Sequence, residues 1–198
     1  MSIPDPLQGV PDYRSLPLDR ELRRELRSDH AGEIGAVEIY RGILAVSREP
    51  AVRDFATEHL QTELRHRAFF DAWLPREGRT RLAPVWRLAG WLLGASGALF
   101  GARGVFRTIE AVETFVDHHY AAQVEAMAGT AELAPLAAVL ESFREDEVDH
   151  RDDAAGRSAG RPGWTGRAWT AARAWAWSWP GDSRPAARRR RAAPEHVF

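Results

Sequence analysis

The sequence predicts an all-α protein, a bundle of four helices in which one connection is long and apolar. The chain is rich in Ala and Leu and poor in β-branched residues, and this composition favours helix over sheet. Segments of helical length occur in two pairs, each joined by a short turn, with about 30 residues between the pairs. At 198 residues the chain can form one well-buried domain and is short for two.

The first pair of helices follows a proline-rich start. Residues 1–17 contain four prolines and are expected to form an extended lead-in. A helix is predicted from Asp19, a suitable N-cap residue, to about Ser47. Pro50 suits the first turn of a second helix, which is expected to end near Trp73.

The rest of the chain divides into the long connection, the second pair of helices and a biased tail. The connection includes an apolar segment at 84–102. Further helices are predicted over about 104–128 and 132–155. Residues 18–157 are therefore interpreted as the bundle domain. Residues 158–198 are interpreted as a Trp-rich segment, with an additional C-terminal helix, followed by an Arg-rich tail.

The apolar connection is a candidate membrane-interface element. The uncharged stretch between Arg87 and Arg103 is only 15 residues long, shorter than the roughly 17–25 that a spanning helix needs. A helix lying in the interface, anchored by Trp86 and Trp91, fits this length better. The alternative is a buried core helix. Trp-rich residues 164–179 are likewise either a second membrane contact or a compositionally biased tail.

A repeated motif carries the chemistry. Glu-x-x-His occurs twice, and each copy is preceded by a lone glutamate on a separate predicted helix. Residues three apart on a helix share a face, so each copy can offer a carboxylate and an imidazole to one point. Four carboxylates and two imidazoles from four helices form the ligand set of a ferritin-like dinuclear iron or manganese site. The predicted metal ligands are Glu33, Glu63, His66, Glu113, Glu147 and His150.

Composition excludes several other kinds of site. The chain has no Cys, which excludes disulfides, thiolate catalysis and Cys-ligated iron–sulfur clusters. A net charge of −1 argues against a general nucleic-acid binder. Carboxylates with imidazoles suit iron or manganese, whereas zinc would bring no redox chemistry. The N-terminal residues lack a basic region followed by an apolar one, so we expect a bacterial chain without a signal peptide.

Three further residues are candidates for supporting roles. His119 and Tyr120 follow Glu113 by one to two helical turns and are expected to orient metal ligands, the alternative being ordinary local hydrogen bonds. His59 lies one turn before Glu63 on the same face, where it would either compete as a ligand or pack nearby. No catalytic group beyond the metal ligands is singled out.

The ordered motifs over about residues 26–153 resemble the Coq7 family of demethoxyubiquinone hydroxylases. The resemblance implies a ferritin-like, di-iron monooxygenase at a membrane surface that hydroxylates a polyprenyl methoxy-benzoquinone with O₂ and electrons traced to NADH. It implies the same six ligands, with Glu63 and Glu147 as the bridging pair. The matching motifs are Asp29-His-Ala-Gly-Glu-Ile-Gly-Ala36 with Tyr40, Glu63-x-x-His66, Pro84-x-Trp86, Ala111-Val-Glu-Thr with His118-His-Tyr120, and Phe143-Arg-Glu-Asp-Glu-Val-Asp-His150.

The resemblance also carries expectations about partners and location. These are two Fe ions, a polyprenyl quinone, O₂, membrane lipid at the cytoplasmic side of a bacterial inner membrane, and a second copy of the chain or a ubiquinone-biosynthesis complex. The family usually has an apolar residue in place of His59, and the match weakens beyond residue 153. Two alternatives stay open: a ferritin-like ferroxidase or peroxidase with the same ligands, and a non-catalytic membrane adaptor.

Overall fold

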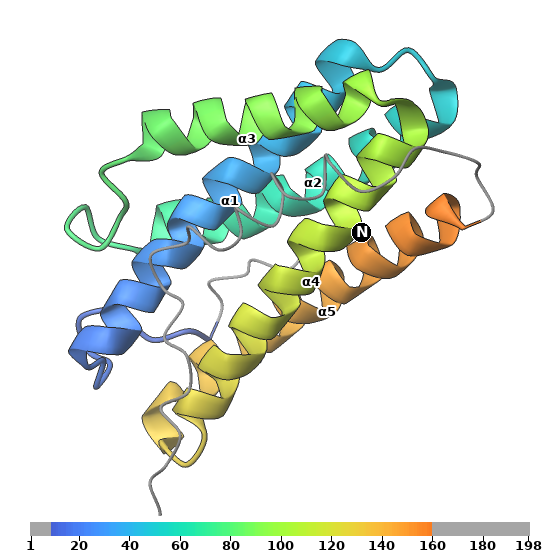
Figure 1. Cartoon of the computed structure of the whole chain (residues 1–198). Helices are drawn as coiled ribbons and strands as arrows, with labels where there is room; N and C mark the ends of the chain where they lie inside the picture. The colour runs from blue at the N-terminus through green and yellow to red at the C-terminus, as the bar shows by residue number, and fades with distance from the viewer. Residues whose placement is uncertain (1–8, 160–198) are drawn as a thin grey trace, which may run out of the picture.

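The computed structural model describes residues 9–159, and within this range it contains five α-helices, one 3₁₀ turn and no strand (Figure 1). The all-α prediction is confirmed. The expected C-terminal helix and Trp-rich segment fall at 160–198 and lie outside the described residues. The elements are α1 (Arg20–Val46), α2 (Pro50–Trp73), α3 (Ala83–Leu99), α4 (Gly101–Met127), the 3₁₀ turn η1 (Ala131–Leu133) and α5 (Ala134–Ser158).

Local signals in the sequence set the helix ends. The side chain of Asp19 caps α1 by accepting a hydrogen bond from the backbone N–H of Leu22 at 2.7 Å. Pro50 lies in the first turn of α2, where its missing N–H costs nothing. The break between α3 and α4 comes slightly earlier than predicted. Gly101 has a φ of +71°, a left-handed conformation that only glycine adopts readily, and it turns the chain from α3 into α4.

The helices form two antiparallel pairs, α1 with α2 and α4 with α5, and α3 lies along the outside of α1 (Figure 1). The backbones of α1 and α3 touch. A Cβ added at Gly94 would lie 1.9 Å from the carbonyl oxygen of Ile39, and one added at Gly90 would lie 2.3 Å from that of Gly35. We call these four residues the α1–α3 seam. Only glycine permits so close an approach, and α3 is therefore fixed firmly to α1.

The face of α3 that points away from α1 is apolar and exposed. Only small residues of α3 are buried, so it is not the fully buried core helix of the alternative interpretation. No helix within residues 9–159 is long and apolar enough to cross a membrane. The large exposed residues of this apolar face and its flanks are Leu82, Val85, Leu88, Trp91, Leu92, Leu99 and Phe100.

Two hydrophobic clusters occupy the ends of the bundle and leave a polar layer between them. Phe55 of α2 and Phe106 of α4 belong to one cluster. Phe69 and Trp73, further along α2, belong to the other, which also includes Tyr13 of the N-terminal segment. The middle of α2 thus lies between two apolar regions that keep water away from it.

Candidate metal centre

The six predicted ligands converge in this middle layer, and each is at most 4% exposed. Their ligand atoms form two overlapping groups, and within each group all atoms lie within 4.8 Å of one another. Glu63 and Glu147 belong to both groups, which is the arrangement required if two carboxylates bridge two ions. The groups are Glu33, Glu63, His66 and Glu147, and Glu63, Glu113, Glu147 and His150.

Each of the four bundle helices supplies part of the cluster. Glu33 comes from α1 and Glu113 from α4, while α2 and α5 each contribute one Glu-x-x-His. The three-residue spacing places both side chains of a motif on one helix face. In α2 and α5 this face points toward the centre of the bundle. The structure brings together all six residues that the sequence pattern selected; that they bind metal stays a prediction.

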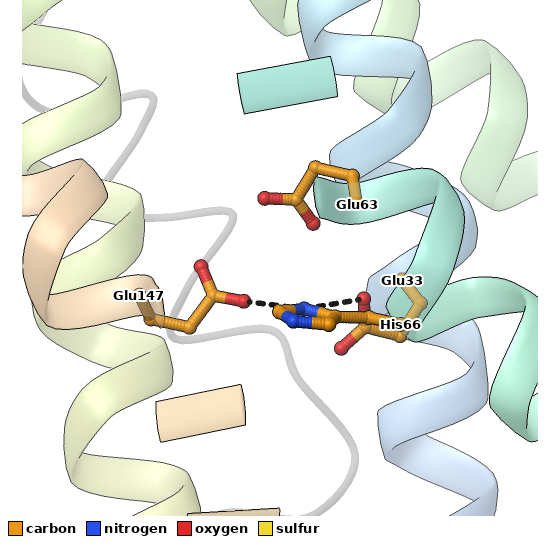
Figure 2. Close-up of side chains that lie close together, drawn as sticks. All are labelled: Glu33, Glu63, His66 and Glu147. Carbon is orange, nitrogen blue, oxygen red and sulfur yellow. Dashed lines mark hydrogen bonds and ion pairs between the residues drawn. The ribbon is translucent and has the colours of Figure 1, made fainter. Parts of the chain in front are cut away.

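The imidazoles lie between carboxylates of different helices. Nδ1 of His66 is 3.1 Å from Glu147 and 3.8 Å from Glu33. Dashed lines in Figure 2 mark both contacts. Nδ1 of His150 is 3.1 Å from Glu63 and 3.3 Å from Glu147. Each histidine thus directs one ring nitrogen toward the space that the carboxylates share.

Burial governs the ionisation of the carboxylates. It raises the pKa of Glu33, Glu63 and Glu113, and the charge of Glu147 raises each further. Burial would also raise the pKa of Glu147, but the adjacent imidazoles of His150 and His66 outweigh burial and bring that pKa below its ordinary range. Without a metal, the cluster keeps one firmly ionised carboxylate among others that hold protons more tightly than usual.

The two histidines, unlike most of the carboxylates, favour their charged form. Burial disfavours the charge of His66, but hydrogen bonds to Asp146 and Glu147 outweigh it and raise the pKa of His66 to about 10. His150 is likewise opposed by burial and stabilised by Glu147 and Glu63, which raise its pKa to about 11. In the metal-free protein near neutral pH, both imidazoles are therefore cations that partly neutralise the carboxylates.

Atoms without a hydrogen-bond partner indicate what the cluster fits. Among buried side-chain atoms in residues 9–159, both oxygens of Glu63 and one each of Glu33 and Glu147 make no hydrogen bond, and neither does Nδ1 of His150. Buried polar atoms are normally satisfied, and a group left without a partner is costly. Carboxylate oxygens and imidazole nitrogens are suitable ligands for divalent iron or manganese. The donor set therefore fits two such ions.

Two tyrosines support the lone glutamates across the bundle. The hydroxyl of Tyr120 on α4 donates to Glu33 on α1 at 2.5 Å. The hydroxyl of Tyr40 on α1 donates to Glu113 on α4 at 3.2 Å. Tyr120 was predicted as a supporting residue, whereas no such role was predicted for Tyr40. Its contact with α4 depends on how the helices pack, and spacing within α1 does not reveal it.

His119, the other predicted supporting residue, interacts with a carboxylate outside the six. Its Nε2 lies 2.7 Å from Asp29, and Gln123 donates from its amide nitrogen to both oxygens of Asp29, at 2.9 and 3.1 Å. Asp29 is 1% exposed and was not predicted as part of the site. These three residues link α1 to α4 beside the cluster of six residues.

Asp146 is a further residue that the sequence interpretation missed. One of its carboxylate oxygens is 2.9 Å from Nε2 of His66, the ring nitrogen that faces away from the cluster. A carboxylate in this position fixes the orientation and tautomer of a metal-binding histidine. Asp146 directly precedes Glu147, and that adjacency is the only signal in the sequence, because the partner belongs to another helix.

His59, left open as a possible ligand, belongs to neither ligand group. Its Nε2 lies 3.1 Å from Asp153 at the edge of the bundle. The ring of His59 packs against the ring of His150, with 4.2 Å between centroids. Of the two interpretations, packing beside the cluster describes this position.

A cavity opens beside the cluster between α1 and α4. The empty space there amounts to about 380 Å³ only when the open solvent at its mouth is counted. Glu63 and Glu147 reach it from the other two helices, so a bound molecule would lie against the predicted bridging carboxylates. The wall residues from α1 and α4 are Asp29, Gly32, Glu33, Ala36, Val112, Glu113, Phe115, Val116, His119 and Tyr120.

The fold and the cluster together define a class of protein. A helical bundle with one long connection, in which four helices direct four carboxylates and two imidazoles inward, is the architecture of ferritin-like carboxylate proteins that hold two metal ions. The family model described as ubiquinone biosynthesis protein COQ7 matches residues 20–167. The chain belongs to the COQ7 family.

Curated relatives agree with this assignment. A protein of Rhodospirillum rubrum named 3-demethoxyubiquinol 3-hydroxylase is 39% identical over 151 residues, which are 75% of this chain and 68% of the relative. Mitochondrial proteins of Dictyostelium discoideum and Rattus norvegicus, named NADPH-dependent 3-demethoxyubiquinone 3-hydroxylase, are 37% and 34% identical. The matches cover 65% and 64% of this chain and 61% and 60% of those relatives. The chain thus spans somewhat less than two thirds of the two mitochondrial relatives.

Proposed function

We propose that this chain is an O₂-dependent di-iron monooxygenase that hydroxylates the ring of a demethoxy polyprenyl benzoquinone or its quinol in ubiquinone biosynthesis. One observation carries the proposal: two groups of ligand atoms share Glu63 and Glu147 and border an open cavity. The names of relatives support the proposal, because they describe hydroxylases of this quinol or quinone. The matches to these relatives cover 75% and 65% of this chain.

The proposed metal ligands are the six residues of the cluster, with Glu63 and Glu147 bridging. Two iron ions bound there would supply the electrons that reduce O₂. The protein supplies a site largely closed to water, because apolar clusters lie on both sides along the helices. NADH is the proposed source of the electrons, whereas the names of the mitochondrial relatives specify NADPH.

The cavity suits a quinone ring in its chemistry. Val112, Phe115 and Val116 offer apolar contacts to the ring, while Asp29 and His119 offer polar groups for its oxygen substituents. In this proposal the cavity walls orient the ring edge toward the bridging carboxylates, where oxygen would be activated. The substrate is thus held by α1 and α4, and the oxygen chemistry belongs to the ions between all four helices.

The apolar face of α3 is the proposed site of membrane contact. A polyprenyl tail partitions into a bilayer, so the enzyme has to meet its substrate at the lipid surface. Leu88, Trp91 and Leu92 are 61%, 39% and 52% exposed on this face, and Trp favours the interface. We place the enzyme peripherally on the cytoplasmic side of a bacterial inner membrane, with a second copy or other ubiquinone-biosynthesis proteins as partners.

The decisive experiment follows oxygen into the quinone. Iron-loaded protein in detergent is incubated with ¹⁸O₂, a demethoxy quinone and either NADH or NADPH, and the quinone is analysed by mass spectrometry. We expect a product heavier by one ¹⁸O atom. Glu147→Gln removes a bridging carboxylate and should abolish both iron retention and product. Glu145→Gln, two residues away on the same helix and exposed, is the matched control and should retain both.

The ferroxidase alternative predicts a different result from the same experiment. It predicts O₂ consumption by ferrous iron with no oxygen in the quinone under either electron donor. The names of the relatives do not favour it. Such a result, with two irons bound per chain, would contradict the proposed hydroxylase.

The membrane proposal is tested separately with lipid vesicles. Wild-type protein should sediment with vesicles, and Leu88→Glu together with Leu92→Glu should abolish sedimentation without changing iron content. Ala138→Glu, at an exposed position on α5, is the control and should sediment like the wild type. Equal sedimentation of all three proteins would show that α3 does not dock on lipid.

A further inference from the structure

An aromatic ring occupies the same place in both halves of the sequence repeat. Phe143 precedes Glu147 by four residues, and His59 precedes Glu63 by four residues. Residues four apart share a helix face, so each ring lies one turn before the first ligand of its Glu-x-x-His motif. The two halves differ in the ring itself, a phenyl in one and an imidazole in the other.

In the structure each ring covers the histidine of the opposite helix. Phe143 of α5 stacks on His66 of α2, with 4.1 Å between ring centroids and an angle of 25° between the planes. His59 of α2 lies against His150 of α5, with 4.2 Å between centroids and an angle of 68°. His59 is thus the structural counterpart of Phe143.

His59 is held in place from two directions. The ring of Phe55 lies 4.4 Å away on one side. On the outside, Nε2 of His59 is 3.1 Å from Asp153, whose other oxygen accepts a hydrogen bond from Arg157 at 2.7 Å. His59 is 8% exposed, so its ring is buried while its polar edge reaches the partly exposed Asp153. A ring with these constraints has little freedom to rotate.

The two metal-site histidines differ in how they are anchored. His66 is bonded through both ring nitrogens, to Glu147 on the inside and to Asp146 on the outside. The ion pairs of His150 within residues 9–159 all run from Nδ1, toward Glu63 and Glu147. In the described part of the chain, the packed ring of His59 therefore limits the rotation of His150, as Asp146 limits that of His66.

We propose that His59 is a positioning residue for His150: its ring, anchored through Asp153, holds Nδ1 of His150 toward Glu63 and Glu147. This inference rests on the proposed function only in taking the cluster as a metal site. It assigns His59 no ligand role, because its Nε2 faces Asp153 and it belongs to neither ligand group. The ring of His59 matters, and its nitrogen atoms serve only to fix that ring.

Anaerobic loading with Fe²⁺ tests this without any quinone. The wild-type protein, His59→Ala and His59→Phe are titrated with ⁵⁷Fe²⁺, and Mössbauer spectra report the environments of the two ions. His59→Ala should lose affinity for one ion by about tenfold or more, the range found for lost supporting contacts, with one iron environment altered. His59→Phe keeps a flat ring and should restore wild-type loading and spectrum.

The counterpart ring provides a matched control. Phe143→Ala should weaken binding at the other ion, beside His66, and alter the other spectral component. Circular dichroism confirms that each variant is folded; His59→Val, which keeps apolar bulk without a ring, replaces His59→Ala should that variant fail to fold.

Two outcomes would overturn the inference. Unchanged loading and spectrum in His59→Ala would mean that the ring does not position His150. A loss in His59→Phe as large as that in His59→Ala would mean that a flat ring at this position is not what positions His150. Either result leaves the hydroxylase proposal standing, whereas two bound irons without hydroxylated quinone would remove that proposal and leave this one intact.

Discussion

Tyr40 and Tyr120 occupy equivalent places in the two halves of the bundle, and each donates its hydroxyl to a glutamate of the opposite half. Each tyrosine follows the lone glutamate of its own helix by seven residues. Tyr40 binds Glu113 and Tyr120 binds Glu33, so the two contacts cross between α1 and α4. These crossed hydrogen bonds join two helices that otherwise leave a cavity between them.

Removing either hydroxyl should destabilise the metal-free protein. In Tyr120→Phe the buried Glu33 loses a partner, and an unsatisfied buried group costs about 1–3 kcal/mol. Tyr40→Phe should cost less, because its bond to Glu113 is longer, 3.2 Å against 2.5 Å. Urea unfolding monitored by circular dichroism measures both. A larger loss in Tyr40→Phe than in Tyr120→Phe would contradict this ranking.

Metal binding should release protons. The pKa values of about 10 for His66 and about 11 for His150 mean that both rings are protonated at pH 7 in the metal-free protein. A metal ligand has to be neutral imidazole, so at least about two protons per chain should be released on loading, and affinity should rise with pH up to about 11. Calorimetry in buffers of different ionisation enthalpy counts them. Release of fewer than one would show that these rings are neutral before metal binds.

The glycines of the α1–α3 seam should be essential for the fold, because α1 leaves no room there for a side chain. Gly94→Ala would place a methyl group 1.9 Å from the carbonyl oxygen of Ile39, and the helices would have to separate. We expect a loss of about 1–3 kcal/mol or more in the free energy of unfolding. Gly156→Ala on α5 is the control, since nothing lies within 4 Å of its Cβ position. It should stabilise by about 0.5–1 kcal/mol, and equal effects of the two changes would refute the seam.

His30 should make the protein sensitive to mild acid. Its Nδ1 accepts the backbone N–H of Thr80 at 3.1 Å and its Nε2 lies 2.9 Å from Asp71, so the folded protein uses the neutral ring. Burial lowers the pKa of His30, although the bond to Asp71 opposes this. Because the folded pKa is below the unfolded value of about 6.5, this stability is complete above pH 6.5 and declines as pH falls below it.

The measurement is the free energy of unfolding of the metal-free protein between pH 8 and pH 5. As pH falls through about 6.5, the wild-type free energy of unfolding should decrease relative to that of His30→Gln, because the Gln side chain cannot gain a proton. His59 also has a lowered pKa, but it is present in both proteins and does not affect their difference. Parallel curves for the two proteins would show that His30 does not contribute.

The sequence predicted the helices and the six cluster residues well, because both depend on local signals. Pro50 and Asp19 mark helix starts, and the Glu-x-x-His spacing selects an inward face whatever the partner helix is. Contacts between helices were predicted less well. His119 was expected to support a ligand but binds Asp29, and Asp146 binds His66 across 80 residues of chain. Such pairs depend on the register between helices, which no periodicity within one helix reveals.

The α1–α3 seam also fixes the distance between the six-residue cluster and the exposed face of α3. Helices in direct backbone contact have axes about 8 Å apart, at the lower end of ordinary helix packing. Glu33 lies on α1, two residues before Gly35, which touches Gly90 of α3. If the apolar face of α3 rests on a bilayer, as proposed, α3 and α1 together would hold the cluster at a fixed distance from the lipid. A quinone ring would need to rise only that distance, while its tail stays dissolved in the membrane.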